Sequence, residues 1–198
     1  MRRAIFVFLA FVLLSSGISA HTLDAEATRH LCRVAPPAEI AEWVPTRNTE
    51  LEAYAKEFLR NTDHNSFPVL LCVSNDREAT FAWNRPIHYG RETIFVFGIS
   101  RYFMERTREH LRAIIAHEVG HEVATYKGGA CERVDFLKDN DDYVFCEHDA
   151  DWIGANWVGK PAMLSALEKV LSLMKADGFP QRTLDNVERR ISLLSAAP

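Results

Sequence analysis

The sequence predicts an α+β domain in which a small sheet is followed by a helical C-terminal half. Short segments rich in β-branched and aromatic residues cluster between residues 67 and 97, and this composition is typical of strands. Through most of residues 106–194, apolar residues recur at intervals of three or four positions, which indicates amphipathic helices. The 198 residues are enough for one domain with a substantial core, and no repeat or low-complexity linker divides them.

The first 20 residues have the composition of a signal peptide. Two arginines follow Met1, residues 4–14 are apolar, and residues 15–20 are mostly small or polar. The apolar run is shorter than the ~20 residues that a spanning helix needs, which favours a cleaved signal over a membrane anchor. We therefore expect a signal peptide over residues 1–20, a mature domain over residues 21–198 without a membrane span, and a periplasmic or secreted protein.

Upstream of residue 100, two helices and three strands are expected. Asp24–Leu31 has a short helical pattern, and Asn48–Asn61 carries an apolar face at helical spacing. The strands are expected at Phe67–Val73, Thr80–Trp83 and Thr93–Phe97. Together they form the small sheet.

Downstream, four helices and one acidic loop are expected. The first helix begins at Arg106 or Thr107, with an alternative start nearer Ser100, and ends at Ala124. The loop Asp135–Tyr143 follows it. The remaining helices are expected at Glu147–Val158, Pro161–Ala176 and Leu184–Leu194. Gly120 costs its helix about 1 kcal/mol relative to alanine, so we expect another backbone to pass close to this position.

The most specific chemical signal is the pentapeptide His117-Glu118-Val119-Gly120-His121. In a helix, residues four apart lie on the same face, so His117 and His121 can direct two imidazoles at one point. Two imidazoles suit zinc, and Glu118 is then placed to act as a general base on a water molecule. The motif predicts a catalytic zinc site, which needs a third protein ligand.

Candidates for the third ligand lie in Glu147-His148-Asp149-Ala150-Asp151. Glu147 and Asp151 are four residues apart and share a helix face. One of them can therefore bind the metal while the other accepts a hydrogen bond from a ligand histidine. The alternative third ligand is His148, which would give a site of three histidines. The residues alone leave these assignments open.

The chain contains four cysteines, which we expect to form disulfides in an oxidising compartment. Of the three pairings that four cysteines allow, we favour Cys32–Cys72 and Cys131–Cys146, because the second pair brackets one loop beside the metal motif. A cysteine-rich zinc site is less favoured because the C-x-x-C spacing is absent. The Cys131–Cys146 bond would hold the two ligand helices together.

The two metal motifs resemble those of gluzincin metallopeptidases, in particular the family of the CAAX prenyl proteases and HtpX-like proteases. That family carries H-E-x-x-H and then E-x-x-A-D on the next helix, as in His117–His121 and Glu147–Asp151 here. The resemblance covers roughly residues 48–194 and includes Ile94–Val96, Leu111–Ala116 and Arg190-Ile191. It implies a single zincin-like domain in which the edge strand of the sheet, Thr93–Phe97, lies beside the zinc-binding helix.

By the same resemblance, Glu147 is the third zinc ligand and Asp151 is the hydrogen-bond partner of a ligand histidine. The chain also departs from the family pattern. The gap between His121 and Glu147 is short, a cysteine directly precedes Glu147, and Ala79–Ala82 stands where an N-A-F-A-like segment is expected, without the asparagine. The membrane spans of many members are absent. The resemblance implies a pared-down, exported relative whose substrate class cannot be carried over.

The predicted function is that of an exported zinc endopeptidase that binds one zinc ion per chain and acts on a peptide or protein substrate. Glu118 takes a proton from the attacking water and passes it to the leaving amine. The edge strand Thr93–Phe97 holds an extended peptide by backbone hydrogen bonds. Candidates for stabilising the oxyanion are Tyr126, Tyr143 and His148.

The alternative function is a binding or chaperone module that zinc stabilises and that has no catalytic activity. The intact Glu118 argues against this alternative, because a structural zinc site needs no base. A net charge of −4 argues against nucleic-acid binding, which usually requires a basic face. Cleavage specificity and oligomeric state do not follow from the sequence.

Overall fold

The computed structural model describes residues 23–34, 42–74, 82–104, 106–126, 131 and 141–198. The predicted signal peptide at residues 1–20 lies outside these ranges, as does the part of the predicted acidic loop that precedes residue 141. None of the helices in the described ranges has the length and apolar character needed to cross a membrane.

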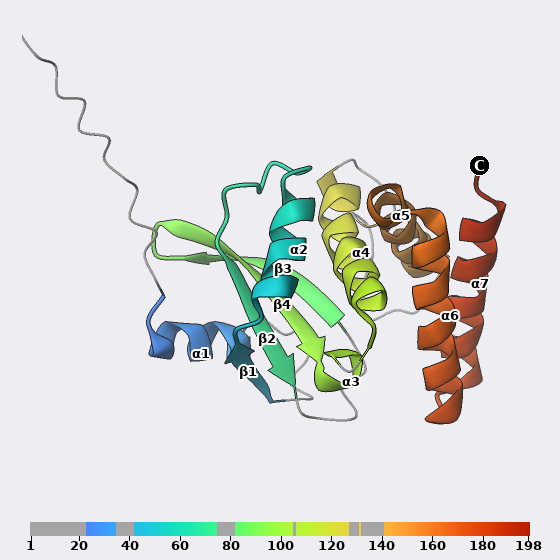
Figure 1. Ribbon diagram of the computed structural model, residues 1–198, viewed down its shortest axis with the longest axis horizontal. Coiled ribbons are helices and arrows are strands. Elements are labelled where there is room, and N and C mark those ends of the chain that lie inside the picture. Colours follow the sequence, from blue (N-terminus) through green and yellow to red (C-terminus); the bar gives the residue numbers. More distant parts are fainter. Residues whose placement is uncertain (1–22, 35–41, 75–81, 105, 127–130, 132–140) are drawn as a thin grey trace, which may run out of the picture.

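A four-stranded mixed sheet forms one end of the molecule, and helices form the other (Figure 1). Its strands are β1 (Trp43–Thr46), β2 (Val69–Ser74), β3 (Ala82–Tyr89) and β4 (Glu92–Ser100), in the order β1-β2-β4-β3. β4 runs parallel to β2 and antiparallel to β3, whereas β1 runs antiparallel to β2. The predicted α+β class, with a small sheet followed by a helical half, is confirmed.

The helices are α1 (Ala25–Val34), α2 (Thr49–Leu59), α3 (Arg101–Met104), α4 (Arg108–Tyr126), α5 (Asp141–Val158), α6 (Lys160–Ala176) and α7 (Gln181–Ala196). In Figure 1, α4 stands between the sheet and the group formed by α5, α6 and α7. The sequence missed β1 and α3. It also placed the start of α5 too late, because the buried side chains of Val144 and Cys146 extend this helix into the segment predicted as loop.

The prediction that Thr93–Phe97 is an edge strand is wrong. β4, which contains these residues, lies between β2 and β3. Its side chains are buried on both faces of the sheet: Phe95 and Phe97 belong to one core, and Ile94 and Val96 to the other. A continuous apolar run is the usual pattern of such an inner strand.

The edge of the sheet next to α4 is β3, not β4. β3 pairs with β4 along residues 82–89, and no strand in the described part of the chain pairs with its other side. Several of its residues are exposed, including Arg85 and Pro86. Charged residues and proline are common on edge strands, because proline cannot donate to a second neighbour.

Two cores hold the sheet in place. The larger core lies between the sheet, α2, α4 and the C-terminal helices, and includes Phe58, Phe95, Phe97, Ile115 and Met163. The smaller core lies under α1 on the opposite face and includes Leu31, Trp43, Ile94, Val96 and the disulfide Cys32–Cys72. This disulfide confirms one of the two predicted pairings, and it lies on the face of the sheet turned away from α4.

The beginnings of three helices are set by capping side chains. Asp24 Oδ1 accepts hydrogen bonds from the first backbone N–H groups of α1, and Asn48 Oδ1 does the same for α2. Thr107 Oγ1 accepts from His110 N at the start of α4, so the predicted start of this helix is confirmed. Such caps satisfy N–H groups that have no partner inside the helix.

A close crossing of α4 and α5 depends on two glycines. A Cβ atom at Gly120 of α4 would lie 2.5 Å from the carbonyl oxygen of Ala150 on α5. A Cβ atom at Gly154 of α5 would lie 3.0 Å from the backbone nitrogen of His117 on α4. The expectation that a backbone passes close to Gly120 is therefore confirmed, and the crossing brings the two predicted metal motifs together.

Candidate metal centre

Three donor side chains converge where α4 and α5 cross. His117 and His121 project from α4, Glu147 projects from α5, and one donor atom of each lies within 4.8 Å of the others. The Nε2 atoms of the two histidines are 3.1 Å apart. Glu147 Oε2 lies 3.4 Å from His117 Nε2, and the other carboxylate oxygen, Oε1, lies 3.3 Å from His121 Nε2. The structure thus brings Glu147 of the second motif next to His117 and His121 of the first.

These separations fit a tetrahedral cation. Donor atoms held ~2.0–2.2 Å from a tetrahedral zinc ion lie roughly 3.4 Å from one another, close to the separations of 3.1–3.4 Å found here. Only 12%, 18% and 10% of the side chains of His117, His121 and Glu147 are exposed. Imidazole and carboxylate donors suit zinc, and three protein ligands leave one coordination position open. The residues present can therefore hold a divalent metal ion.

Asp151 orients the ring of His117. Its Oδ1 lies 2.7 Å from His117 Nδ1, and Asp151 is completely buried. Nδ1 therefore carries a proton and donates a hydrogen bond to the carboxylate. Nε2 faces the donor atoms of His121 and Glu147. The contact expected between Asp151 and a ligand histidine is present.

Arg190 of α7 connects both carboxylates of α5. Its Nε and Nη2 atoms donate to the two oxygens of Asp151, each at 2.8 Å, and its Nη1 lies 2.8 Å from Glu147 Oε2. Only 12% of the side chain of Arg190 is exposed. The sequence offered Arg190 only as part of a C-terminal resemblance, because its partner Asp151 is 39 residues away.

Charges within this group control its protonation. Burial by itself lowers the pKa of His117, but the Asp151 carboxylate and its hydrogen bond outweigh burial and raise the pKa to about 10. Burial by itself raises the pKa values of Glu147 and Asp151, but the charge of Arg190, the neighbouring histidines and their hydrogen bonds together outweigh it. The pKa of Glu147 is held well below its usual range, and that of Asp151 is lowered. Both carboxylates are therefore ionised at neutral pH, and without a bound cation His117 is protonated.

Glu118 is buried and is held by Asn84 of β3. Asn84 Nδ2 donates to the backbone oxygen of Glu118 and lies 3.3 Å from its carboxylate oxygen Oε2. The sequence did not indicate this contact, since the two residues are 34 positions apart. The family pattern has an asparagine where this chain has Ala79, and Asn84 lies five positions further along, on the edge strand β3.

The second nitrogen of His121 faces a disulfide. Cys131–Cys146 is formed, which confirms the second predicted pairing. Nδ1 of His121 lies 3.5 Å from the Cys146 sulfur and 3.7 Å from the Cys131 sulfur. The bond joins the chain that follows α4 to the residue directly before Glu147, so it ties the two ligand helices together as expected.

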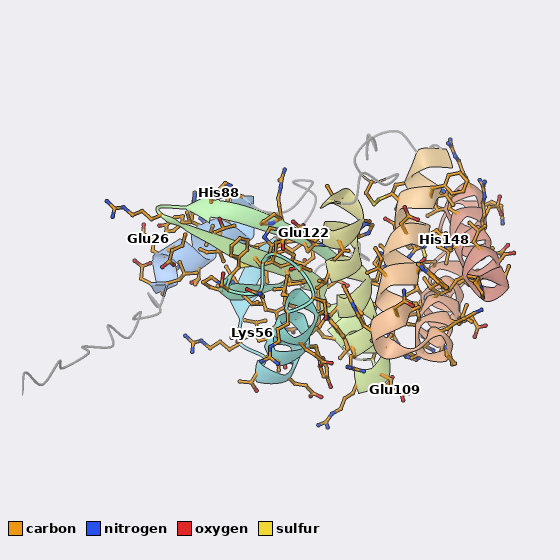
Figure 2. The ribbon with its side chains drawn as sticks, turned by 90° about the horizontal axis from the view of Figure 1, so that it is seen from above. Glu26, Lys56, His88, Glu109, Glu122 and His148 are labelled. Atoms are coloured by element: carbon orange, nitrogen blue, oxygen red, sulfur yellow. A yellow bond between two sulfur atoms is a disulfide. The ribbon has the colours of Figure 1, made fainter. Side chains whose placement is uncertain are left out.

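The three candidate oxyanion stabilisers have different positions. Tyr143 lies one turn before Glu147 on α5 and contributes, with Asp151 and Glu147, to raising the pKa of Arg190 against the effect of burial. His148 does not belong to the donor group around His117 and His121 in the described residues, and Figure 2 shows it on the helical side of α4, away from Glu122. The side chain of Tyr126 lies outside the described part. The geometry favours Glu147 over His148 as third ligand.

Comparison with known proteins found no relative. No protein-family model matches the chain, and neither does any curated protein or solved structure with which it was compared. The function is therefore inferred from the site itself.

Proposed function

We propose that the protein is an exported zinc endopeptidase of the gluzincin type, with a zincin-like domain and one zinc ion per chain. The observation that carries the proposal is the convergence of His117 Nε2, His121 Nε2 and the Glu147 carboxylate at separations of 3.1–3.4 Å. The buried Glu118 beside these ligands favours catalysis, because a purely structural zinc site is normally closed by four protein ligands and needs no base.

The donor set suits hydrolysis. Zinc in such a site supplies a Lewis acid and makes a water molecule acidic near neutral pH. His117 and His121 would hold the ion through Nε2 and Glu147 through a carboxylate oxygen, and Asp151 keeps the His117 ring in the tautomer that this requires. Arg190 neutralises part of the negative charge of Glu147 and Asp151, so the net charge of the site stays small when a divalent cation is present.

Glu118 carries the proton transfers. It accepts a proton from the attacking water and donates it to the nitrogen of the leaving amine. The hydrogen bonds from Asn84 limit the movement of Glu118, which matters because a general base works only within hydrogen-bond reach of its proton. Of the two candidates whose side chains are described, Tyr143 and His148, we favour Tyr143 for stabilising the oxyanion, since it lies on the same face of α5 as Glu147.

The substrate is a peptide in an extended conformation, bound along β3. An exposed sheet edge can pair with an extended peptide through backbone hydrogen bonds, and β3 is the strand that contacts α4 through Asn84 and Glu118. β4 cannot serve, because both of its sides are already paired. The edge thus brings a bound backbone close to the candidate base.

The test compares metal content and peptide cleavage in four proteins. Wild type is expected to bind about one zinc ion and to cleave members of a peptide library. Glu118→Gln should retain zinc and lose cleavage, and His117→Ala should lose both. Glu109→Gln is a matched control, because Glu109 is an exposed glutamate in the first turn of the same helix (Figure 2); it should retain both. Normal cleavage by Glu118→Gln would refute the mechanism.

The same experiment distinguishes the endopeptidase from the alternative function, a binding or chaperone module. Stoichiometric zinc in wild type without metal-dependent cleavage of any peptide would favour a zinc-stabilised binding or chaperone module. Failure of the wild type to bind zinc would reject both functions.

A further inference from the structure

His121 belongs to two groups of donor atoms in the described residues. Its Nε2 faces His117 and Glu147, and its Nδ1 faces the sulfur atoms of Cys131 and Cys146. The group formed by Nδ1 and the two sulfurs, called the sulfur side below, is enclosed: Cys146 is completely buried and Cys131 is 7% exposed. The endopeptidase proposed above uses only the Nε2 side, so the sulfur side has no role in it beyond joining two helices.

The two nitrogen–sulfur distances around Nδ1 of His121 match those of a metal site. Around a tetrahedral zinc ion with Zn–N ~2.0–2.1 Å and Zn–S ~2.3 Å, a nitrogen and a sulfur donor lie roughly 3.6 Å apart. The distances from His121 Nδ1 to the two sulfur atoms are 3.5 and 3.7 Å. The covalent bond between the sulfurs is what keeps them from acting as thiolate ligands.

We propose that reduction of Cys131–Cys146 creates a Cys₂His site for a thiophilic divalent cation such as zinc, made of Cys131, Cys146 and Nδ1 of His121. A dithiol reductant supplies two electrons and two protons and becomes a disulfide itself, while Cys131 and Cys146 become thiols. Each thiol then releases its proton as its sulfur binds the cation. Thiolates are the stronger ligands for zinc-like ions, so the ion is retained on this side.

The two sites compete for one ring. A neutral imidazole has one nitrogen with a free lone pair, and the other nitrogen carries the proton. His121 therefore serves either the Nε2 site or the Nδ1 site. Reduction removes a ligand from the hydrolytic site and places the cation among thiolates. This inhibitory consequence rests on the proposed endopeptidase, whereas the Cys₂His site itself does not.

The other disulfide is a matched control within the same chain. Cys32–Cys72 lies in an apolar core on the opposite face of the sheet, and neither of its cysteines belongs to a donor group in the described residues. Reduction of Cys32–Cys72 is therefore expected to create no metal site.

The test uses Co²⁺ as a spectroscopic probe, because thiolate ligation of cobalt produces an intense charge-transfer absorption in the near ultraviolet. Purified protein is reduced with a phosphine, which offers no thiol of its own, and the free thiols are counted. The charge-transfer band should be absent before reduction and present afterwards, and the apparent dissociation constant for cobalt should fall roughly tenfold or more. Cys32→Ser/Cys72→Ser should keep the band, and Cys131→Ser/Cys146→Ser should lose it.

Two further variants make the result decisive. His121→Ala should weaken cobalt binding in the reduced protein, because it removes one of the three proposed ligands. A reduced chain that bound cobalt through scattered thiolates would be unaffected by this substitution. His117→Ala should abolish cobalt binding in the oxidised protein but keep the band in the reduced one, which separates this proposal from the endopeptidase. Absence of the band when four thiols are counted, or a band unaffected by His121→Ala, would overturn the proposal.

Discussion

The guanidinium of Arg190 contacts Asp151 at two points: Nε and Nη2 each lie 2.8 Å from one carboxylate oxygen. Its remaining nitrogen reaches Glu147. α7 thus takes part in the candidate metal centre although it contributes no ligand, since its arginine sets the positions of two carboxylates that belong to α5.

Arg190→Met is expected to destabilise the metal-free protein by about 3–5 kcal/mol, because it leaves two buried carboxylates without their cation. Bound zinc should reduce this loss, since the ion supplies positive charge at the same place. The measurement is the free energy of unfolding in urea at pH 7, with and without zinc. Arg189→Met is the control: Arg189 is exposed and lies over the ring of Phe145, so its loss should stay below about 1 kcal/mol. Equal losses for Arg190→Met with and without zinc would contradict the charge explanation.

The stability of the metal-free protein should decline in alkaline solution. The pKa of His117 is raised from its ordinary 6.5 to about 10, so its protonated form stabilises the fold fully below pH 6.5, and this contribution is lost as pH rises towards 10. The lowered pKa values of Glu147 and Asp151 act oppositely: their contribution is present at neutral pH and is lost in acid. Urea denaturation measures both trends when the titration runs from about pH 2 to about pH 10.

Asp151→Asn provides the control for this pH dependence. Without the Asp151 carboxylate, the main cause of the raised pKa of His117 is gone, and the alkaline decline should largely disappear.

Zinc should bind more tightly as pH rises, because His117 has to release its proton to become a ligand. Calorimetric zinc titrations in buffers of different ionisation enthalpy count that proton. Zinc uptake without proton release near pH 7 would be incompatible with the charge balance described above.

Asn84→Ala is expected to lower kcat by roughly 10- to 100-fold while leaving zinc affinity unchanged. Asn84 holds the backbone and the carboxylate of Glu118, and a misplacement of about 1 Å in a catalytic group has an effect of this size. The control is Lys56→Ala, which should leave kcat and zinc affinity unchanged. Lys56 is exposed and lies on α2, outside the strand proposed to bind the peptide (Figure 2). A parallel fall in zinc content would show that Asn84 supports the metal ligands instead of the base.

Gly120→Ala should destabilise the protein by about 1–3 kcal/mol, as overpacking of a close contact does, although alanine is the better helix former. The added methyl group would press on the Ala150 carbonyl and move α5, which carries Glu147, away from the histidines. Zinc affinity should therefore also fall, by roughly tenfold or more. Gly90→Ala is the control: Gly90 has a positive φ but open space around it, so that substitution should strain a turn and leave zinc affinity unchanged. Unchanged zinc binding in Gly120→Ala would show that the crossing does not position Glu147.

The local sequence pattern was enough to predict most of the helices and strands and the side chains that could donate to a metal ion. The spacing of His117 and His121 places them on one helix face whatever surrounds the helix, and the same holds for Glu147 and Asp151. Thr107 and Asn48 act within three residues of themselves, so the starts of α4 and α2 could be predicted. The order of the strands could not, because a buried apolar run such as β4 does not itself show which strands flank it.

By itself, the sequence determined which side chains are available for metal chemistry, because helical periodicity and motif spacing are local properties. Only the tertiary structure decided which of them meet. The contacts of Asn84 with Glu118 and of Arg190 with Asp151 span 34 and 39 residues. The position of the Cys131–Cys146 sulfurs against His121 depends on how closely α5 crosses α4. Long-range packing at two glycines, not any local signal, turns two separate motifs into one candidate metal centre.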